Sequence, residues 1–349
     1  MPDDASLGSE QEAGLRDSTS RPPTRLNLAL QGGGAHGAFT WGVLDRLLEA
    51  PDLEIAAISG TSAGAINGCL LAHGLALDGR EGARAKLTEF WRRIAALSAM
   101  SPLQPTPLDR AFGFGRLQYS PVYWALELSS RLFSPYSYNA LNFNPVRETL
   151  LQCIDFDQFR HQHGPQVFVS ATHVREGRMR VFSRPEIGLD AVLASACLPF
   201  LHKAVEVDGE AYWDGGYLGN PAVLPLYEKS DCRDIMVVQV NPIQIDAVPE
   251  SAQDIFDRMN TITFNAGMLR ELHALETLAE RDGVSDLRLH CIEADDTMRG
   301  LGVSSKLNAD WRFLKHLRDV GRSTAEGWLT RNRRKLGQEG TLIPANMYL

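Results

Sequence analysis

Short apolar runs and helically spaced apolar positions alternate in the first part of the chain. The run Leu26–Leu30 is mostly apolar and ends in glycines, as a buried strand does. Residues 38–49 space their large apolar side chains at three- and four-residue intervals, like one face of a helix. The same order returns with Ile55–Ile58, a glycine turn and an apolar helix from Ala65. Repetition of strand, glycine turn and helix predicts a layered α/β fold.

The rest of the chain continues this alternation without an internal repeat. We predict further strands at 167–172, 179–182, 204–207, 235–240 and 287–292, and amphipathic helices at 252–281 and 308–335. We therefore expect one elaborated α/β domain rather than two. Its main part spans 25–228, with an aromatic-rich insertion at about 105–145, and the strands and helices of 229–335 complete it. Polar residues 1–24 are expected to form a disordered tail, and 336–349 a second tail.

The insertion is unusual in its aromatic content. Residues 112–143 hold nine of the 28 aromatic residues, mixed with Gly, Ser and Pro: Phe112, Phe114, Tyr119, Tyr123, Trp124, Phe133, Tyr136, Tyr138 and Phe143. One interpretation is a satellite core beneath a long loop. The other is a lid, or the wall of a pocket for an acyl chain, because aromatic side chains line apolar ligand sites.

Net charge and cysteine content narrow the classes of binding partner and the cellular compartment. The 349 residues contain 35 Lys+Arg and 43 Asp+Glu, a net charge of −8, which argues against nucleic-acid binding. It also argues against attachment to an anionic membrane by overall charge, and leaves transient membrane-surface contact through a local basic or aromatic patch. Five scattered cysteines without a CxxC pair favour a reducing compartment. We expect a cytoplasmic protein, peripheral at a membrane at most, because no signal peptide or spanning segment is visible.

The first candidate for chemistry is the glycine-rich sequence GGGAHG at Gly32–Gly37. It follows a predicted strand and precedes a predicted helix, so it matches the dinucleotide pattern GxGxxG, with Glu54 as the downstream acid. By itself this pattern is weak. Its physical meaning is more general, since such loops aim backbone N–H groups at an anion. That anion could be a pyrophosphate or a reaction oxyanion.

The second candidate is GTSAG at Gly60–Gly64, again between a strand and a helix. GxSxG in this setting is the pattern of a nucleophile elbow, in which a sharp turn lifts the serine hydroxyl above the sheet. The start of the following helix favours developing negative charge. This motif points to Ser62 as a nucleophile, which needs a base.

A base is found more readily among the acids than among the nine histidines. None of the histidines lies in a convincing late loop, and the pair His161 and His163 has no metal-binding partners, which fits a solvated surface pair. Asp214 instead stands at the end of a predicted strand, before Gly215 and Gly216. Taken alone, this Asp-Gly pair favours a hairpin turn.

In their order and spacing, the three motifs resemble the patatin-like phospholipase family, as does the segment Ala194–Pro199. The resemblance covers about 200 residues, from Leu26 to Tyr227. It implies a three-layer α/β/α sandwich with a central, mostly parallel sheet, and catalysis without metal or cofactor. It assigns Ser62 as nucleophile, Asp214 as general base and the N–H groups of Gly32, Gly33 and Gly34 as oxyanion hole, with motif support from Gly37, Gly60, Gly64, Gly215 and Gly216.

The resemblance implies a lipid acyl hydrolase of the phospholipase A or lysophospholipase type. Its substrate would be a phospholipid or another acyl ester, and we expect partial desolvation to raise the pKa of Asp214. One departure concerns His36, where the family commonly has arginine, so His36 is a candidate substrate contact whose charge depends on pH. Two alternatives stay open: a lipid-binding or regulatory protein with a vestigial site, and a dinucleotide-binding oxidoreductase.

Overall fold

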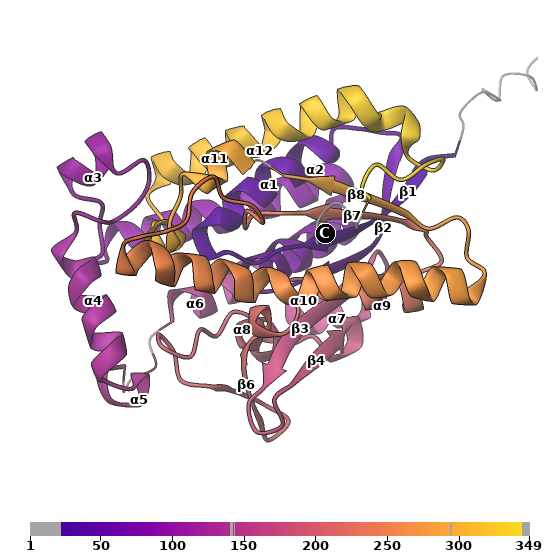
Figure 1. The fold of residues 1–349 in the computed structure, drawn as a ribbon. Coiled ribbons are helices and arrows are strands. Elements are labelled where there is room, and N and C mark those ends of the chain that lie inside the picture. Colours follow the sequence, from indigo (N-terminus) through magenta and orange to yellow (C-terminus); the bar gives the residue numbers. More distant parts are fainter. Residues whose placement is uncertain (1–21, 140–141, 143, 294, 344–349) are drawn as a thin grey trace, which may run out of the picture.

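A central eight-stranded sheet organises the molecule, and its strands are connected by helices on both faces (Figure 1). The computed structural model describes residues 22–139, 142, 144–293 and 295–343. In spatial order the strands are β5 (Val205–Val207), β6 (Glu210–Asp214), β3 (Gln166–His173), β2 (Leu53–Gly60), β1 (Thr24–Leu30), β7 (Asp234–Val238) and β8 (Arg288–Ile292), and β4 (Arg178–Ser183) also pairs with β3.

The sheet is parallel in its centre and antiparallel at one side. Strands β3, β2, β1, β7 and β8 run parallel to their neighbours, while β4 and β6 pair antiparallel with β3, and β5 with β6. Every residue of β7 is buried, as is the second half of both β1 and β2, because helices cover both faces there. The carboxyl ends of these parallel strands are where an open α/β sheet places its ligands.

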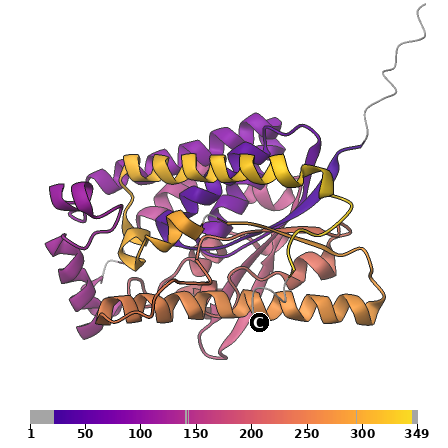
Figure 2. The ribbon, with the colours of Figure 1, turned by 45° about the horizontal axis from the view of Figure 1, so that its top comes forward.

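Two helical layers enclose the sheet, with α12 and α10 on opposite sides of it (Figure 2). One layer contains α1 (Gly37–Leu47), α2 (Ala63–Ala99), α6 (Pro145–Cys153), α7 (Phe156–His161), α8 (Leu189–Ser195) and α12 (Trp311–Asn332). The other contains α9 (Leu224–Lys229) and α10 (Ala252–Asp282). The three-layer α/β/α architecture with a mostly parallel sheet is therefore confirmed.

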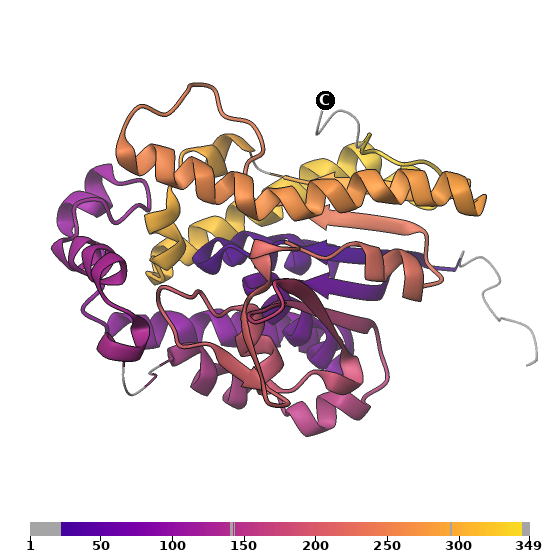
Figure 3. The same ribbon diagram turned by 60° about the horizontal axis from the view of Figure 1, so that its bottom comes forward.

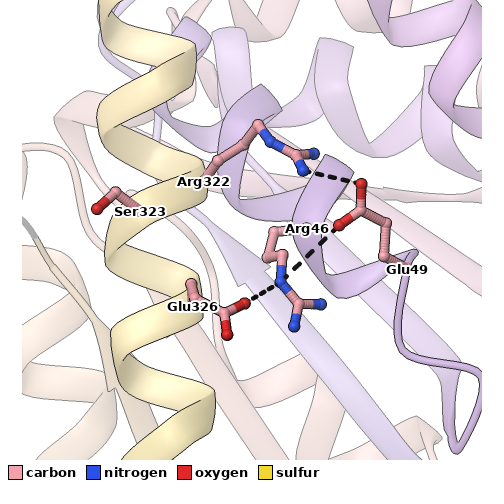
Figure 4. Close-up of a pocket in the computed structure, with 5 residues that line it drawn as sticks. All are labelled: Arg46, Glu49, Arg322, Ser323 and Glu326. Carbon is pink, nitrogen blue, oxygen red and sulfur yellow. Dashed lines mark hydrogen bonds and ion pairs between the residues drawn. The ribbon is translucent and has the colours of Figure 1, made fainter.

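The C-terminal helix α12 belongs to the same core as the first helix, α1. A Cβ on Gly42 would lie 1.9 Å from the Arg318 carbonyl oxygen, and one on Gly321 would lie 2.1 Å from that of Phe39, so only glycine permits this backbone approach. Ion pairs flank the contact: Arg322 with Glu49 at 2.8 Å, and Arg46 with Glu326 (Figure 4). Residues beyond 300 therefore pack directly on the element that follows the glycine loop.

The hairpin turn that the Asp-Gly pair alone suggests does not form at Asp214. Residues Asp208 and Gly209, both with positive φ, connect β5 to β6 as a two-residue hairpin. Asp214 instead ends β6 and caps a short 3₁₀ turn, η3 (Gly215–Tyr217), through its side chain. The Asp-Gly-Gly sequence thus leads away from the sheet edge and leaves the carboxyl group facing the protein interior.

The aromatic insertion forms three short helices at one end of the molecule (Figure 3). These are α3 (Pro107–Phe112), α4 (Pro121–Leu132) and α5 (Pro135–Tyr138). Of its aromatic residues, Tyr123 is 3% exposed, whereas seven are exposed by 37–84%: Phe112, Phe114, Tyr119, Trp124, Phe133, Tyr136 and Tyr138. Phe143 lies outside the described residues. The interpretation as a satellite core is therefore wrong for most of the segment.

The remaining elements of the described residues are one short helix and four 3₁₀ turns. They are α11 (Asp295–Arg299) and the 3₁₀ turns η1 (Gly34–His36), η2 (Arg184–Glu186), η4 (Val303–Leu307) and η5 (Arg333–Lys335). The Leu117 N–H donates to Ser304 Oγ on η4, which in turn contacts η1. In the described ranges, we find no helix with the length and apolar character needed to cross a bilayer.

Candidate active site

Ser62 occupies the sharp turn between β2 and α2. Its backbone has φ 54° and ψ −123°, a combination that costs energy for a residue with a side chain and is typical of a nucleophile elbow. The Ser62 N–H donates to Ser195 Oγ at 2.9 Å, and the Thr61 side chain donates to the Gly219 carbonyl at 2.7 Å. These bonds to α8 and to the loop after η3 hold the strained turn in place.

Asp214 is a buried carboxylate with one oxygen left unpaired. The residue is 1% exposed, and its Oδ1 accepts the Gly216 N–H at 2.7 Å. Its Oδ2 is buried and has no hydrogen-bond partner in the described parts of the chain. Such an oxygen can accept a proton, because nothing else occupies its lone pairs.

Burial changes the acidity of this group. Desolvation raises the pKa of Asp214 to about 6, as expected, while the Gly216 N–H, the Ser62 hydroxyl and the Lys306 ammonium limit the rise. The Ser62 hydroxyl is thus close enough to interact with the carboxyl group, although Oδ2 forms no well-aligned hydrogen bond. Catalytic hydrogen bonds are often loose before substrate binds. At neutral pH the carboxyl group is mainly ionised and can act as a base.

The glycine loop lies directly against Ser62. A Cβ on Gly32 would stand 2.6 Å from Ser62 Cβ, and Gly34 has φ +58°, a conformation that favours glycine. The Gly32 N–H is already engaged, since it donates to Asn220 Oδ1 at 2.6 Å. The N–H groups of Gly33 and Gly34 have no acceptor among the residues that the structure describes. Of the three expected oxyanion donors, these two are available to a ligand.

Buried amide side chains hold the glycine loop from behind. Asn241 Nδ2 donates to the Gly32 carbonyl at 2.9 Å, and the Asn241 N–H donates to Gln31 Oε1 at 3.0 Å. Gln31 Nε2 in turn donates to Asn265 Oδ1 at 3.0 Å. Together with Asn220, these residues are at most 3% exposed. The loop backbone is therefore fixed by side chains from β1, from the end of β7 and from α10.

The other motif glycines stand where backbones or side chains meet closely. A Cβ at any of them would lie within 2.7 Å of another heavy atom: Gly37, Gly60, Gly64, Gly215 and Gly216. Their neighbours include Ala63 on the elbow, the Leu30 carbonyl that ends β1, and the ring of Phe264 on α10. These glycines let the elbow, the glycine loop and the Asp214 turn pack against one another.

His36 is turned into the protein. It is 3% exposed, its Nε2 lies 2.7 Å from Ser305 Oγ, and burial together with the Lys306 charge lowers its pKa to about 3. The ring is therefore neutral and hydrogen-bonded to η4. A positive charge is instead supplied nearby by Lys306, whose Nζ donates to Asn241 Oδ1 at 2.8 Å.

The structure brings Ser62, the glycine loop and Asp214 to one place, and adds residues that the motifs did not indicate. Asn220, Asn241 and Lys306 are the principal additions. Asn241 could have been suspected, because it follows the predicted strand 235–240, at whose carboxyl end ligands bind. Lys306 carries no comparable signal. Across the described ranges, His, Cys, Asp and Glu side chains form no group of three suited to a metal ion.

Comparison with known proteins agrees with this arrangement. The family model described as "Patatin-like phospholipase" matches residues 28–227, which contain all three motifs. The chain therefore belongs to the patatin-like phospholipase family, whose members are lipid acyl hydrolases. This assignment replaces the dinucleotide-binding alternative. A comparison with curated proteins gave no match.

The solved structures that match this chain are distant in sequence. VipD from Legionella pneumophila has 15% identity and a TM-score of 0.42, with 89% of this chain and 68% of VipD covered. The type III effector protein ExoU has 17% identity and a TM-score of 0.32, with 89% and 53% covered. Full-length ExoU in complex with SpcU, from the type III secretion system of Pseudomonas aeruginosa, has 14% identity and a TM-score of 0.30, with 88% and 53% covered. The chain thus spans about half of ExoU.

Proposed function

We propose that this protein hydrolyses fatty acyl esters of lipids through a Ser62–Asp214 dyad and an acyl-enzyme. The observation that carries the proposal is the pairing of a serine in a strained elbow with a buried carboxylate whose Oδ2 has no partner. A raised pKa makes Asp214 a stronger base than an ordinary aspartate, while leaving it ionised at neutral pH.

The reaction begins when Ser62 Oγ attacks the ester carbonyl and its proton passes to Asp214 Oδ2. The N–H groups of Gly33 and Gly34 donate to the developing oxyanion, and each such donor contributes about 10²–10³ in rate. Asp214 then returns the proton to the leaving alcohol. In the second half, Asp214 takes a proton from water, which attacks the acyl-enzyme, and then gives that proton to the departing Ser62 Oγ as the fatty acid is released. The remaining choice, a lipid-binding protein with a vestigial site, leaves this arrangement unexplained.

Two variants test the dyad, each beside a matched control. Ser62→Ala should abolish covalent labelling by a fluorophosphonate and lower hydrolysis of lysophospholipid by at least about 10³-fold. Asp214→Asn should lower hydrolysis by about 10²–10⁴-fold, because the amide cannot accept the proton. Ser251→Ala and Asp310→Asn are the controls, since these residues also cap helix starts, but on α10 and α12.

Both controls should keep wild-type labelling and turnover. Circular dichroism and thermal melting verify that each variant is folded. Folded Ser62→Ala protein that still hydrolyses the ester would refute the assignment. Wild-type protein that neither labels nor turns over any acyl ester would instead support the vestigial alternative.

A further inference from the structure

The 3₁₀ turn η4 (Val303–Leu307) packs against the glycine loop, although it lies about 270 residues away in the sequence. Ser305 Oγ meets His36, and the Lys306 carbonyl oxygen would lie 2.5 Å from a Cβ on Gly34. The turn therefore touches the loop at the two residues that flank Ala35. This contact fixes the backbone of Lys306 beside the candidate oxyanion site.

The Lys306 ammonium lies between the glycine loop and the Asp214 turn. On one side Nζ donates to Asn241 Oδ1 at 2.8 Å, and Asn241 holds the Gly32 carbonyl. On the other side Nζ stands 5.6 Å from the centre of the Phe264 ring, whose edge fills the space beside Gly216. Asn241 thus separates the ammonium from the glycine loop, and Phe264 separates it from the Asp214 turn.

This positive charge has no partner of opposite sign at close range. Within the described ranges no carboxylate lies within 4 Å of Nζ, and only one of its three N–H donors has an acceptor, Asn241. Asp257 acts on it at longer range and is occupied by the Val303 N–H and by Gln253, while Asp214 faces Ser62. A partly buried ammonium without a counter-ion is costly unless a ligand completes it. Its pKa, lowered by burial to about 8, leaves it charged at neutral pH.

The chemistry of the site selects an anionic oxygen group. Lysine binds phosphate as a point charge, and two donors of Lys306 are free to do so. Neutral His36 supplies no charge, although the family commonly has arginine at this position of the glycine loop. In a glycerophospholipid the phosphate is joined to the acyl ester through the glycerol carbons, so both groups can lie near Ser62 at once. A fatty acid carboxylate offers similar chemistry but arises only as product.

We propose that Lys306 forms an anion-binding subsite that receives the headgroup phosphate of the lipid whose ester Ser62 attacks. This inference rests on the proposed function. It names the substrate class of the enzyme as phosphate-bearing acyl esters rather than neutral glycerides. Lys306 is thereby a specificity-determining residue contributed by the C-terminal part of the chain, outside the segment 28–227 that the family model matches.

The test compares two substrates that carry the same acyl chain, a monoacyl glycerophosphocholine and the corresponding monoacylglycerol. Lys306→Gln should lower the ratio of their kcat/KM values about tenfold, mainly through KM of the phosphate ester, as loss of a charge-assisted contact predicts. Lys229→Gln is the matched control, because Lys229 Nζ also lies 5.6 Å from a phenylalanine ring, that of Phe168, but on α9. Its substrate ratio should equal that of the wild type.

A measurement on the unmodified protein covers the case in which Lys306→Gln does not fold. Glycerol 3-phosphate should inhibit hydrolysis of the monoacylglycerol competitively, and far better than glycerol does. Equal inhibition by the two compounds would overturn the proposal, as would a Lys306→Gln protein that loses both substrates to the same extent. If Lys306→Gln weakened inhibition by free fatty acid and changed nothing else, Lys306 would bind the product carboxylate, and the proposal would again be overturned. Failure of the dyad is separate: it appears as hydrolysis that survives Ser62→Ala.

Discussion

The region around Ser62 differs from the segment 101–139, which holds the described part of the aromatic insertion up to 139 and the residues leading into it, in how polar groups find hydrogen-bond partners. Around Ser62, buried polar groups are hydrogen-bonded by residues from α8, from α10 and from the ends of β1 and β7, whereas Asp214 Oδ2 has no partner in the described residues. In the insertion, helix starts are capped by their own side chains, such as Thr106 with Asp109, while large apolar side chains face solvent. The first region is thus held by residues distant in the sequence, whereas the helix starts of the insertion are capped locally and a bond from Leu117 to Ser304 joins it to η4.

This contrast shows where the molecule departs from ordinary packing. Among the buried polar atoms without a partner in the described residues, Asp214 Oδ2 is the carboxylate oxygen, and an unpaired carboxylate indicates chemistry because it is costly to bury. An apolar surface on the insertion is a departure of another kind, since exposed groups of large apolar residues commonly mark contact surfaces. The same apolar segment has a net charge of +1 at residues 101–139, from three arginines and two acids, in a chain of net charge −8. Substitutions can therefore test the two regions independently.

The largest effect is expected from removing the clamp on the glycine loop. Asn220→Ala leaves the Gly32 N–H without its acceptor and frees the loop that carries the oxyanion donors. Loss of a buried hydrogen bond of about 1–3 kcal/mol, expressed in the transition state, lowers kcat by about tenfold to a hundredfold. Steady-state kinetics with a soluble p-nitrophenyl ester measure this loss.

Asn27 offers the control for that substitution. It is also fully buried, but its Nδ2 donates to the Cys232 carbonyl at 2.9 Å, away from the glycine loop. Asn27→Ala should therefore reduce stability while kcat of the folded protein stays at the wild-type value. Equal losses of kcat in the two variants would mean that Asn220 acts only through stability.

An effect of intermediate size is expected on the free energy of unfolding, because burying the ionised Asp214 carboxyl group destabilises the folded protein. Because the pKa of Asp214 is raised from 3.8 to about 6 in the folded protein, folding favours its protonated form. The contribution of this group to stability is greatest below pH 3.8 and declines as the pH rises to about 6. Asp214→Asn, which cannot ionise, should thus be more stable than the wild type at pH 8, by up to about 3 kcal/mol.

Chemical denaturation at several pH values measures this difference. The gap between Asp214→Asn and wild type should open between about pH 4 and pH 6 and stay constant above. Asp310→Asn, which replaces the half-buried capping carboxyl group of α12 by a capping amide, provides the control and should show no gain in stability that opens with rising pH. A gap that is constant from pH 4 to pH 8 would contradict the raised pKa.

The smallest effect is expected in the insertion. Leu128 and Leu132 lie one helical turn apart on α4 and are 58% and 64% exposed. Replacing either by serine should change the free energy of unfolding by less than about 0.5 kcal/mol and leave hydrolysis of the soluble ester unaltered. Leu70→Ala in the core, where Leu70 is fully buried, should cost about 2–5 kcal/mol. A large loss of stability in the α4 variants would show that this face is packed against other residues.

Local sequence was sufficient for the elements and the motifs. The predicted strands Leu26–Leu30 and Ile55–Ile58 lie within β1 and β2, and the helix predicted at 252–281 matches α10. These predictions succeed because the periodicity of apolar residues, the glycine turns and the helix caps all depend on residues close together in the sequence. The same locality explains why the Asp-Gly pair at Asp214, taken alone, also suits a hairpin, which the chain forms at Asp208 instead.

The sequence by itself thus determined the layered α/β fold, the family and the residues Ser62 and Asp214 as the proposed dyad. Tertiary structure decided that Gly32 gives its N–H to Asn220, that His36 is buried against Ser305, and that Lys306 brings a charge to the glycine loop. The first two contacts join residues 188 and 269 positions apart, and Lys306 meets Gly34 across 272 positions. No pattern of neighbouring residues encodes such a contact, because it depends on how β1, the Asp214 turn and the C-terminal elements pack around one sheet.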